Sequence, residues 1–169
     1  MNADIMRLAD NLPELNTLLD EADHVDMKSF DSKRSLSDFI ARMVSYEPGW
    51  LKLLYMVRKG LAKLLGLSQV ATDNKHLTAD DIDFTPGAEV SFFTTSGGAP
   101  DHYWIGEASD KHLKGYIGVV AVPNSDGSIR FNTFTIVHYQ HWTGPIYFNL
   151  IRPFHHIIVH FMGRHAAEE

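Results

Sequence analysis

The sequence predicts an α+β fold in which a curved antiparallel sheet of about five strands wraps around a long C-terminal helix. The first observation is a series of four consecutive runs rich in β-branched and aromatic residues, which begins after residue 87 and has separators short enough for hairpins. The second is an apolar pattern at helical spacing that ends the chain. The third is a pair of helical patterns between an early strand and those four runs, so we expect two helices between strands one and two.

The N-terminal part predicts short helical turns and then a strand. Residues 4–20 place leucine and isoleucine at helical steps that are interrupted at Pro13. We expect residues 1–22 to form a peripheral segment over an edge or the mouth of the sheet. In residues 24–31 one face holds Val25, Met27 and Ser29, and the other holds His24, Asp26, Lys28 and Phe30. This alternation favours a strand.

Two helices should follow this strand. Ser35 can cap the first one, with Asp38 three residues later as in a capping box with a shorter acid, and Pro48 ends it. The second should run from about Trp50 to Leu65, with Gly66 after it as a C-terminal cap. Residues 69–83 are polar and rich in turn formers, so we expect a surface loop without regular structure.

The four later runs predict an antiparallel meander, because their connections are too short for parallel crossovers. They cover Val90–Thr95, His102–Ala108, Leu113–Val122 and Ile129–Gln140. A terminal helix from about Gly144 to His165 should then lie across the concave face of the sheet. This order of elements is a helix-grip plan, which usually leaves a pocket between sheet and helix.

The terminal helix should have an apolar stripe toward the sheet and a polar stripe toward solvent. The apolar positions are Tyr147, Phe148, Leu150, Ile151, Phe154, Ile157, Ile158 and Phe161. The polar positions are Asn149, Arg152, His156, His160 and Arg164. Pro153 should bend the helix, which lets it follow a curved sheet.

Composition narrows the class of protein. A chain of 169 residues that is 44% hydrophobic and 21% charged suits one globular domain, 1–169. A formal charge of −6 without a basic patch argues against nucleic acid as a partner. The absence of Cys excludes a disulfide framework, a thiol nucleophile and a thiolate metal site. The sequence shows neither a signal peptide nor a membrane-spanning run, so we expect a cytoplasmic protein without membrane contact.

Several short motifs resemble the bacterial family called domain of unknown function 2867. They are Asp110-Lys-His112-Leu113, His138-Tyr-Gln-His141 leading through Gly144 to Tyr147, and Arg152-Pro-Phe-His155. Asp23, Asp26 and Pro48-Gly-Trp50 also fit, so the resemblance covers about Asp23 to Ala166. It implies the helix-grip plan that polyketide cyclases, lipid-transfer domains and birch-pollen-type allergens share. In this family the domain occurs alone or beside a nicotinamide-dependent dehydrogenase domain, but this chain has no glycine-rich dinucleotide motif and no cofactor is expected.

Candidate catalytic and metal-binding residues are few. Asp110 and His112 flank a tight turn, where the structural interpretation is a turn and strand cap and the functional one is proton transfer at a cavity mouth. His138 is a third candidate for acid–base chemistry. His156 and His160 are four residues apart on the helix, but no third ligand is evident and a solvated face explains them, so no metal is predicted.

Candidate ligand-binding residues lie where sheet and helix should diverge. They are Trp104, Gly106, His138, Trp142, Tyr147 and Ile151. Gly106 shares a strand face with Trp104, and a glycine there would leave room for a ligand. Aromatic residues at such a junction can equally fill a core.

We therefore predict a small-molecule binding module with an apolar cavity that holds a hydrophobic or aromatic ligand. One alternative is an acid–base enzyme, such as a cyclase, isomerase or hydrolase, that uses histidine and aspartate in the cavity. Another is a structural or regulatory domain, with a homodimer formed through the terminal helix or the 1–22 segment.

Overall fold

One antiparallel sheet forms the centre of the molecule. The computed structural model describes residues 3–50 and 76–168. Within them, six strands pair in the order β1-β6-β5-β4-β3-β2, and every neighbouring pair is antiparallel. The strands are β1 (His24–Ser32), β2 (Glu89–Val90), β3 (Phe93–Ala99), β4 (Tyr103–Ser109), β5 (Leu113–Pro123) and β6 (Ile129–Tyr139). The predicted α+β class and the antiparallel meander are confirmed.

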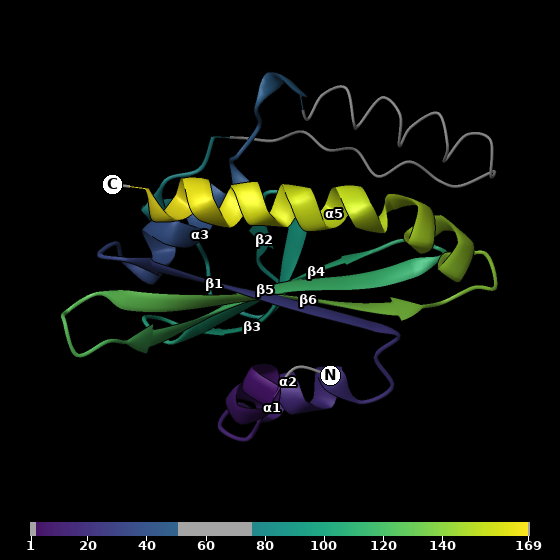
Figure 1. Cartoon of the computed structure of the whole chain (residues 1–169), viewed down its shortest axis with the longest axis horizontal. Coiled ribbons are helices and arrows are strands. Elements are labelled where there is room, and N and C mark those ends of the chain that lie inside the picture. The colour runs from purple at the N-terminus through teal and green to yellow at the C-terminus, as the bar shows by residue number, and fades with distance from the viewer. Residues whose placement is uncertain (1–2, 51–75, 169) are drawn as a thin grey trace.

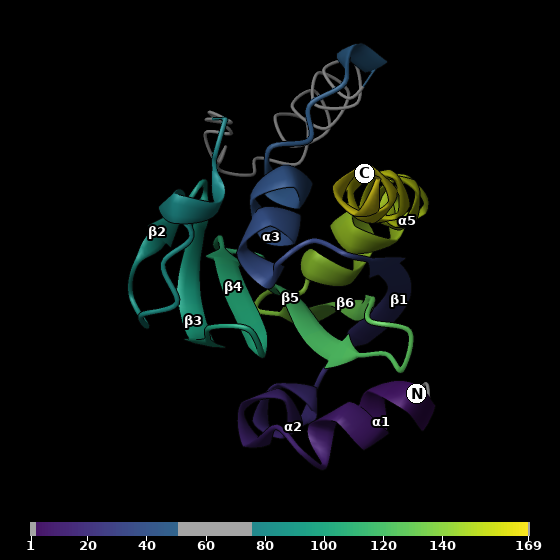
Figure 2. The same ribbon diagram turned by 90° about the vertical axis from the view of Figure 1, so that its left-hand side faces the viewer.

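Helices cover both faces of this sheet. The sheet curls around α3 (Leu36–Val44) and the long terminal helix α5 (Gly144–Ala167), which lie on its concave side (Figures 1 and 2). On its other face lie α1 (Ala3–Ala9) and α2 (Pro13–Leu19). Because β1 and β2 are opposite edges, the chain between them must cross the sheet, and α3 forms in that crossing. The predicted helix-grip plan, with α5 along the concave face, is confirmed.

Helix α3, the first of the two helices predicted after β1, begins where the sequence predicts. Ser35 Oγ accepts a hydrogen bond of 3.2 Å from the Asp38 backbone N–H. The Arg34 guanidinium also binds the Asp38 carboxylate at 2.7 Å, close to the helix N-terminus, where a negative charge is stabilised. The second predicted helix, Trp50–Leu65, lies outside the described residues except for Trp50 itself.

The predicted loop 69–83 contains one regular turn in its described part. The 3-10 helix η1 (Ala79–Asp81) begins where the Asp81 carboxylate accepts hydrogen bonds from the Thr78 backbone N–H and hydroxyl, both at 2.7 Å. This reciprocal cap stabilises a turn that composition alone presents as irregular.

The described part of the chain forms a sheet of six strands where the sequence predicts about five. Ser91 has a φ of 59°, so the predicted run Val90–Thr95 turns back on itself and splits into β2 and β3. β3 then continues through Gly97 and Gly98, which we expected in a hairpin turn. A side chain at Gly98 would crowd Phe84, whose atoms lie 3.0–3.1 Å from where a Cβ would stand, so close packing explains this glycine inside a strand.

The two faces of the sheet bury separate apolar cores. The larger core joins α3, the concave face and the end of α5, and includes Phe39, Ile40, Trp104, Val119 and Phe131. The second core lies under α1 and α2, where Ile5 and Leu15 are fully buried against Phe134 and Ile136. Residues 3–22 therefore form a covering layer over this face of the sheet at β1, β4, β5 and β6.

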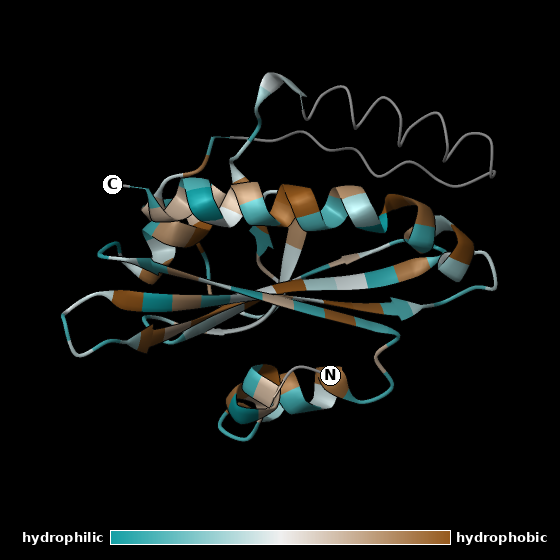
Figure 3. Cartoon of the chain, viewed as in Figure 1, coloured by the Kyte–Doolittle hydropathy of each residue, from teal (hydrophilic) through white to brown (hydrophobic). Residues whose placement is uncertain are grey.

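The orientation of α5 differs from the prediction. Leu150, Phe154, Ile157 and Phe161 were expected to face the sheet, but all are exposed. His156, expected on the solvated side, faces β1 instead. Apolar residues recur along the whole helix (Figure 3) and include both buried and exposed ones, so hydrophobic spacing alone does not fix its rotation. Gly163 does, because it lets the backbone approach the Phe30 ring where any side chain would collide.

Candidate functional site

Polar residues occupy the concave face where α5 crosses β1 and β6. The strand register pairs Asp26 with Thr135 and Lys28 with Thr133, and strand alternation puts these four side chains on the side of α5. His156 reaches them from the helix, with its Nδ1 atom 3.0 Å from Asp26 Oδ2. The predicted division of β1 into two faces is thereby confirmed. The concave polar site, as we call it, consists of His24, Asp26, Lys28, Thr133, Thr135, His155 and His156.

Asp26 is the charged centre of this site. Its Oδ2 atom accepts hydrogen bonds from Lys28 Nζ at 2.9 Å and from His156 Nδ1 at 3.0 Å. Burial alone would raise the pKa of Asp26, but the hydrogen bonds from Lys28 and His156 outweigh it and hold the pKa below its usual value. Asp26 is therefore a carboxylate that only accepts hydrogen bonds.

Four buried polar atoms of the site have no hydrogen-bond partner. They are His24 Nε2, Thr133 Oγ1, Thr135 Oγ1 and His155 Nε2, and the described residues hold three further such atoms elsewhere. Leaving a buried donor or acceptor unpaired costs about 1–3 kcal/mol, so native proteins rarely cluster such atoms. A bound water or ligand that supplies partners would remove this cost.

The two unpaired imidazoles are held in their neutral forms. Burial lowers the pKa of His155 to about 4, and the neighbouring His156 ring contributes in the same direction. Part of the His155 residue reaches the surface, but its Nε2 atom is buried. Burial also lowers the pKa of His24, with Arg152 and His156 adding to the effect. At neutral pH the site thus offers uncharged ring nitrogens to a ligand.

Aromatic rings adjoin these polar groups. The Phe148 ring centroid lies 4.9 Å from that of His24, 6.3 Å from that of His155 and 6.1 Å from that of Tyr139. The arrangement therefore combines hydrogen-bonding atoms with an apolar surface, as small-molecule sites commonly do.

Two of the predicted ligand-binding residues lie inside the larger core. Trp104 is 0% exposed, and its indole Nε1–H donates to Thr95 Oγ1 at 3.0 Å. A Cβ atom added at Gly106 would stand 2.7 Å from Trp104 Cζ2 and 2.9 Å from Phe93 Cβ. The space beside Gly106 is filled by the Trp104 ring, contrary to the expectation of an open volume there.

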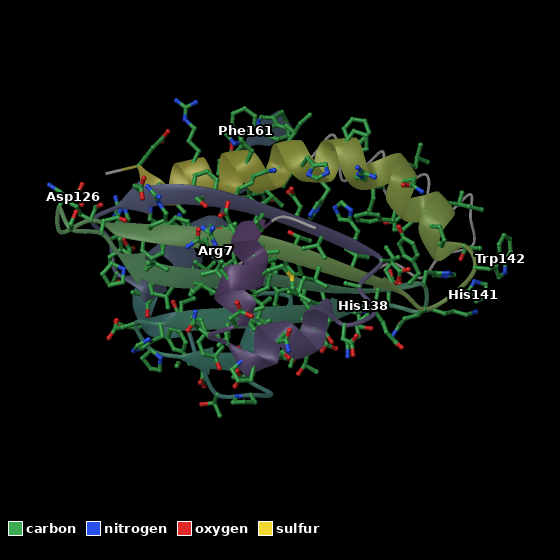
Figure 4. All side chains as sticks on the ribbon, turned by 60° about the horizontal axis from the view of Figure 1, so that its bottom comes forward. Arg7, Asp126, His138, His141, Trp142 and Phe161 are labelled. Atoms are coloured by element: carbon green, nitrogen blue, oxygen red, sulfur yellow. The ribbon has the colours of Figure 1, made fainter. Side chains whose placement is uncertain are left out.

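The other four residues of that set fall in three separate surroundings. His138 lies on the face toward α2, where its Nε2 contacts the Leu18 carbonyl at 3.1 Å. Trp142 is 73% exposed in the turn before α5 (Figure 4). Tyr147 is buried and packs with Leu113 and Ile151. The structure therefore does not bring the predicted set together.

The candidate acid–base residues are also apart. Asp110 Oδ1 accepts hydrogen bonds from the backbone N–H groups of His112 at 2.7 Å and Leu113 at 2.9 Å, which is the turn interpretation of this residue. His112 is buried, and its Nδ1 lies 2.6 Å from Thr143 Oγ1, which also lies 3.0 Å from His141 Nδ1. His138 is on the opposite sheet face, so these three candidates do not converge.

Histidine is abundant near α5, but no metal centre is formed by the part of the chain that the structure describes. No three His, Asp or Glu side chains are grouped there as ligands. His156 binds Asp26, whereas His160 packs against the rings of Phe30 and Phe161. The two histidines thus have separate partners.

A comparison with protein families decides which group this chain belongs to. The model of the family described as "Protein of unknown function (DUF2867)" matches residues 18–162, which is most of the chain. The chain belongs to this family. The resemblance inferred from the motifs at Asp110, His138 and Arg152 is confirmed. The matched range also contains every residue of the concave polar site.

Two solved structures are similar at low sequence identity. The protein Mll3558 from Rhizobium loti is 8% identical, with 84% of this chain and 96% of that chain covered and a TM-score of 0.42. Norcoclaurine synthase from Thalictrum flavum is 15% identical, with 86% and 87% covered and a TM-score of 0.40. Among curated proteins, none matches this sequence. None of the described helices is long and apolar enough to cross a membrane.

Proposed function

We propose that this protein is a small-molecule binding module whose ligand lies between α5 and the concave face of β1 and β6. The observation that supports it is the cluster of four unpaired buried polar atoms on surfaces that face each other. Phe148 and Tyr139 supply aromatic area beside them. The ligand that fits these groups is small, has a hydrophobic or aromatic body, and carries a polar group that bonds to imidazole and hydroxyl side chains.

The proposal moves the ligand from the position that the sequence predicts. In this proposal the ligand contacts residues of β1, β6 and α5 instead of Trp104 and Gly106, because the Trp104 ring fills the space beside Gly106. The lining is also more polar than the apolar cavity that we expected.

Replacing Thr133 with valine, which has the same shape, should leave the free energy of unfolding unchanged or raise it by about 1 kcal/mol, because an unpaired buried hydroxyl is removed. The matched control is Thr95→Val, because Thr95 Oγ1 is bonded to both the Asp83 carbonyl and the Trp104 indole. That control should lose about 1–2 kcal/mol. Urea unfolding measures both. Equal losses in the two variants would show that Thr133 is satisfied in solution and would remove the main support for a ligand site.

The exposed apolar side chains of α5 support the interaction domain as a second candidate. Ile146, Leu150, Phe154, Ile157 and Phe161 are 40–55% exposed and follow one another at three- and four-residue steps. A homodimer that pairs these stripes should sediment as a dimer, and Leu150→Glu should convert it to a monomer. A wild-type protein that sediments as a monomer at all concentrations contradicts the dimer.

A further inference from the structure

The concave polar site contains a carboxylate–imidazole pair in which the proton position is fixed. Asp26 is a carboxylate and can only accept, so the hydrogen between Asp26 Oδ2 and His156 Nδ1 must belong to His156. In the neutral imidazole the lone pair is then on Nε2. No hydrogen bond joins any of the described residues to that Nε2 atom, and the His156 side chain is 31% exposed. His156 thus presents an oriented base, as a carboxylate-bound histidine does in general acid–base catalysis.

The neighbouring groups can stabilise the negative charge that forms on a small molecule when a base removes its proton. His155 and His24 have buried ring nitrogens without partners, and Thr133 and Thr135 have buried hydroxyls without partners. Such uncharged groups can donate hydrogen bonds to an oxygen on which negative charge develops. The charged groups around His156 are Asp26 and Lys28 on β1 and Arg152 on its own helix.

We infer that the Asp26–His156 pair transfers protons to and from carbon in a bound small molecule, a step that rests on the proposed ligand site. The substrate class is a neutral compound with an acidic C–H bond beside an electron-withdrawing group such as a carbonyl. His156 Nε2 takes the proton, the C–H electron pair forms a C=C bond, and the carbonyl π pair moves to oxygen. When a second C=C bond is conjugated with this enolate, return of the proton to the far carbon of the conjugated system moves the double bond and reforms the carbonyl, which completes an isomerisation without oxidant, reductant or co-reactant.

The probe for this step is 5-nitrobenzisoxazole, a neutral aromatic compound that opens when a base removes the single C–H proton of its isoxazole ring. The C–H pair forms the nitrile, the N–O bond breaks, and the coloured phenolate keeps that electron pair. The wild-type protein should open the probe with saturable kinetics. His156→Gln should lower the rate by about 100-fold, the size of a general-base contribution. The control is His160→Gln, one turn away on the exposed side of α5, which should keep the wild-type rate.

Asp26 acts here as a positioning residue, so its variant needs a readout besides rate. Asp26→Asn should lower the rate, and two-bond ¹H–¹⁵N spectra should show that His156 is no longer protonated only at Nδ1. Thermal midpoints check that all variants fold.

A rate that His156→Gln retains overturns the inference. Probe binding, detected by amide shifts at Thr135, without any enhanced rate also overturns it, and leaves the binding function in place. If neither binding nor rate is found, the inference fails for this compound class, and the Thr133→Val stability comparison decides the binding function separately.

Discussion

Replacing Gly106 with leucine is expected to lower the free energy of unfolding by about 3 kcal/mol. A Cβ atom at this position would stand 2.7 Å from Trp104 Cζ2 and 2.9 Å from Phe93 Cβ, and the remaining carbons of leucine need still more space. Trp104 is fully buried and held by its hydrogen bond to Thr95, so its ring has no free volume into which to move.

The matched control for this change is Gly115→Ala on the neighbouring strand β5. A Cβ there meets only the Ala108 carbonyl oxygen, at an ordinary 3.7 Å, so the change should cost less than about 1 kcal/mol. Urea unfolding compares the two variants with the wild type. A Gly106→Leu protein as stable as the wild type would mean that open space lies beside Trp104, as the sequence alone suggests.

Acid should destabilise the protein through His155. The pKa of His155 is about 4 in the folded chain against 6.5 for a solvent-exposed imidazole, so the unfolded chain binds more protons between these values. The free energy of unfolding therefore falls as the pH falls from about 6.5 toward 4. Between pH 7 and pH 4.5 the His155 contribution amounts to about 2 kcal/mol. The pKa values of His24 and His165 are also lowered by burial, and both act in the same direction.

The variant His155→Leu should remove most of this loss, because the buried group that must be protonated on unfolding is gone. Unfolding curves in urea at pH 7 and pH 4.5 measure the difference for each protein. The control is His102→Leu, a change at an exposed histidine in the turn before β4. If His155→Leu loses as much stability as the wild type over this range, His155 is not buried in its neutral form.

Much of the fold could be predicted because local patterns and tertiary structure agree. The alternation in β1 identifies its two faces, and Ser35 with Asp38 identifies the start of α3. The break between β2 and β3 could not be predicted, because Ser91 adopts a left-handed backbone conformation that serine rarely signals. The predicted rotation of α5 was wrong because it depends on the contact between Gly163 and Phe30, which can be seen only when the helix and the strand are placed together.

The candidate site was harder to predict than the fold. Its residues come from β1, β6 and α5, so no single motif contains them. The sequence does carry a partial signal. His24, Asp26 and Lys28 share one face of a strand, whereas a strand face that packs against a helix usually carries apolar side chains. What marks these residues as a site is that buried atoms around them, such as His24 Nε2 and Thr135 Oγ1, have no hydrogen-bond partner. An unpaired buried atom can be recognised only in the three-dimensional structure.

The central claim is that the concave polar site holds a small molecule, and NMR shift mapping tests it most directly. Mixtures of small neutral aromatic compounds that carry a carbonyl or hydroxyl group are added to ¹⁵N-labelled protein. We predict that binders shift the backbone amides of His24, Thr135 and His155 most, and that Thr135→Val weakens those shifts. Shifts confined to the outer side of α5 around Leu150 and Phe161, or to the core around Trp104, would contradict the proposed site.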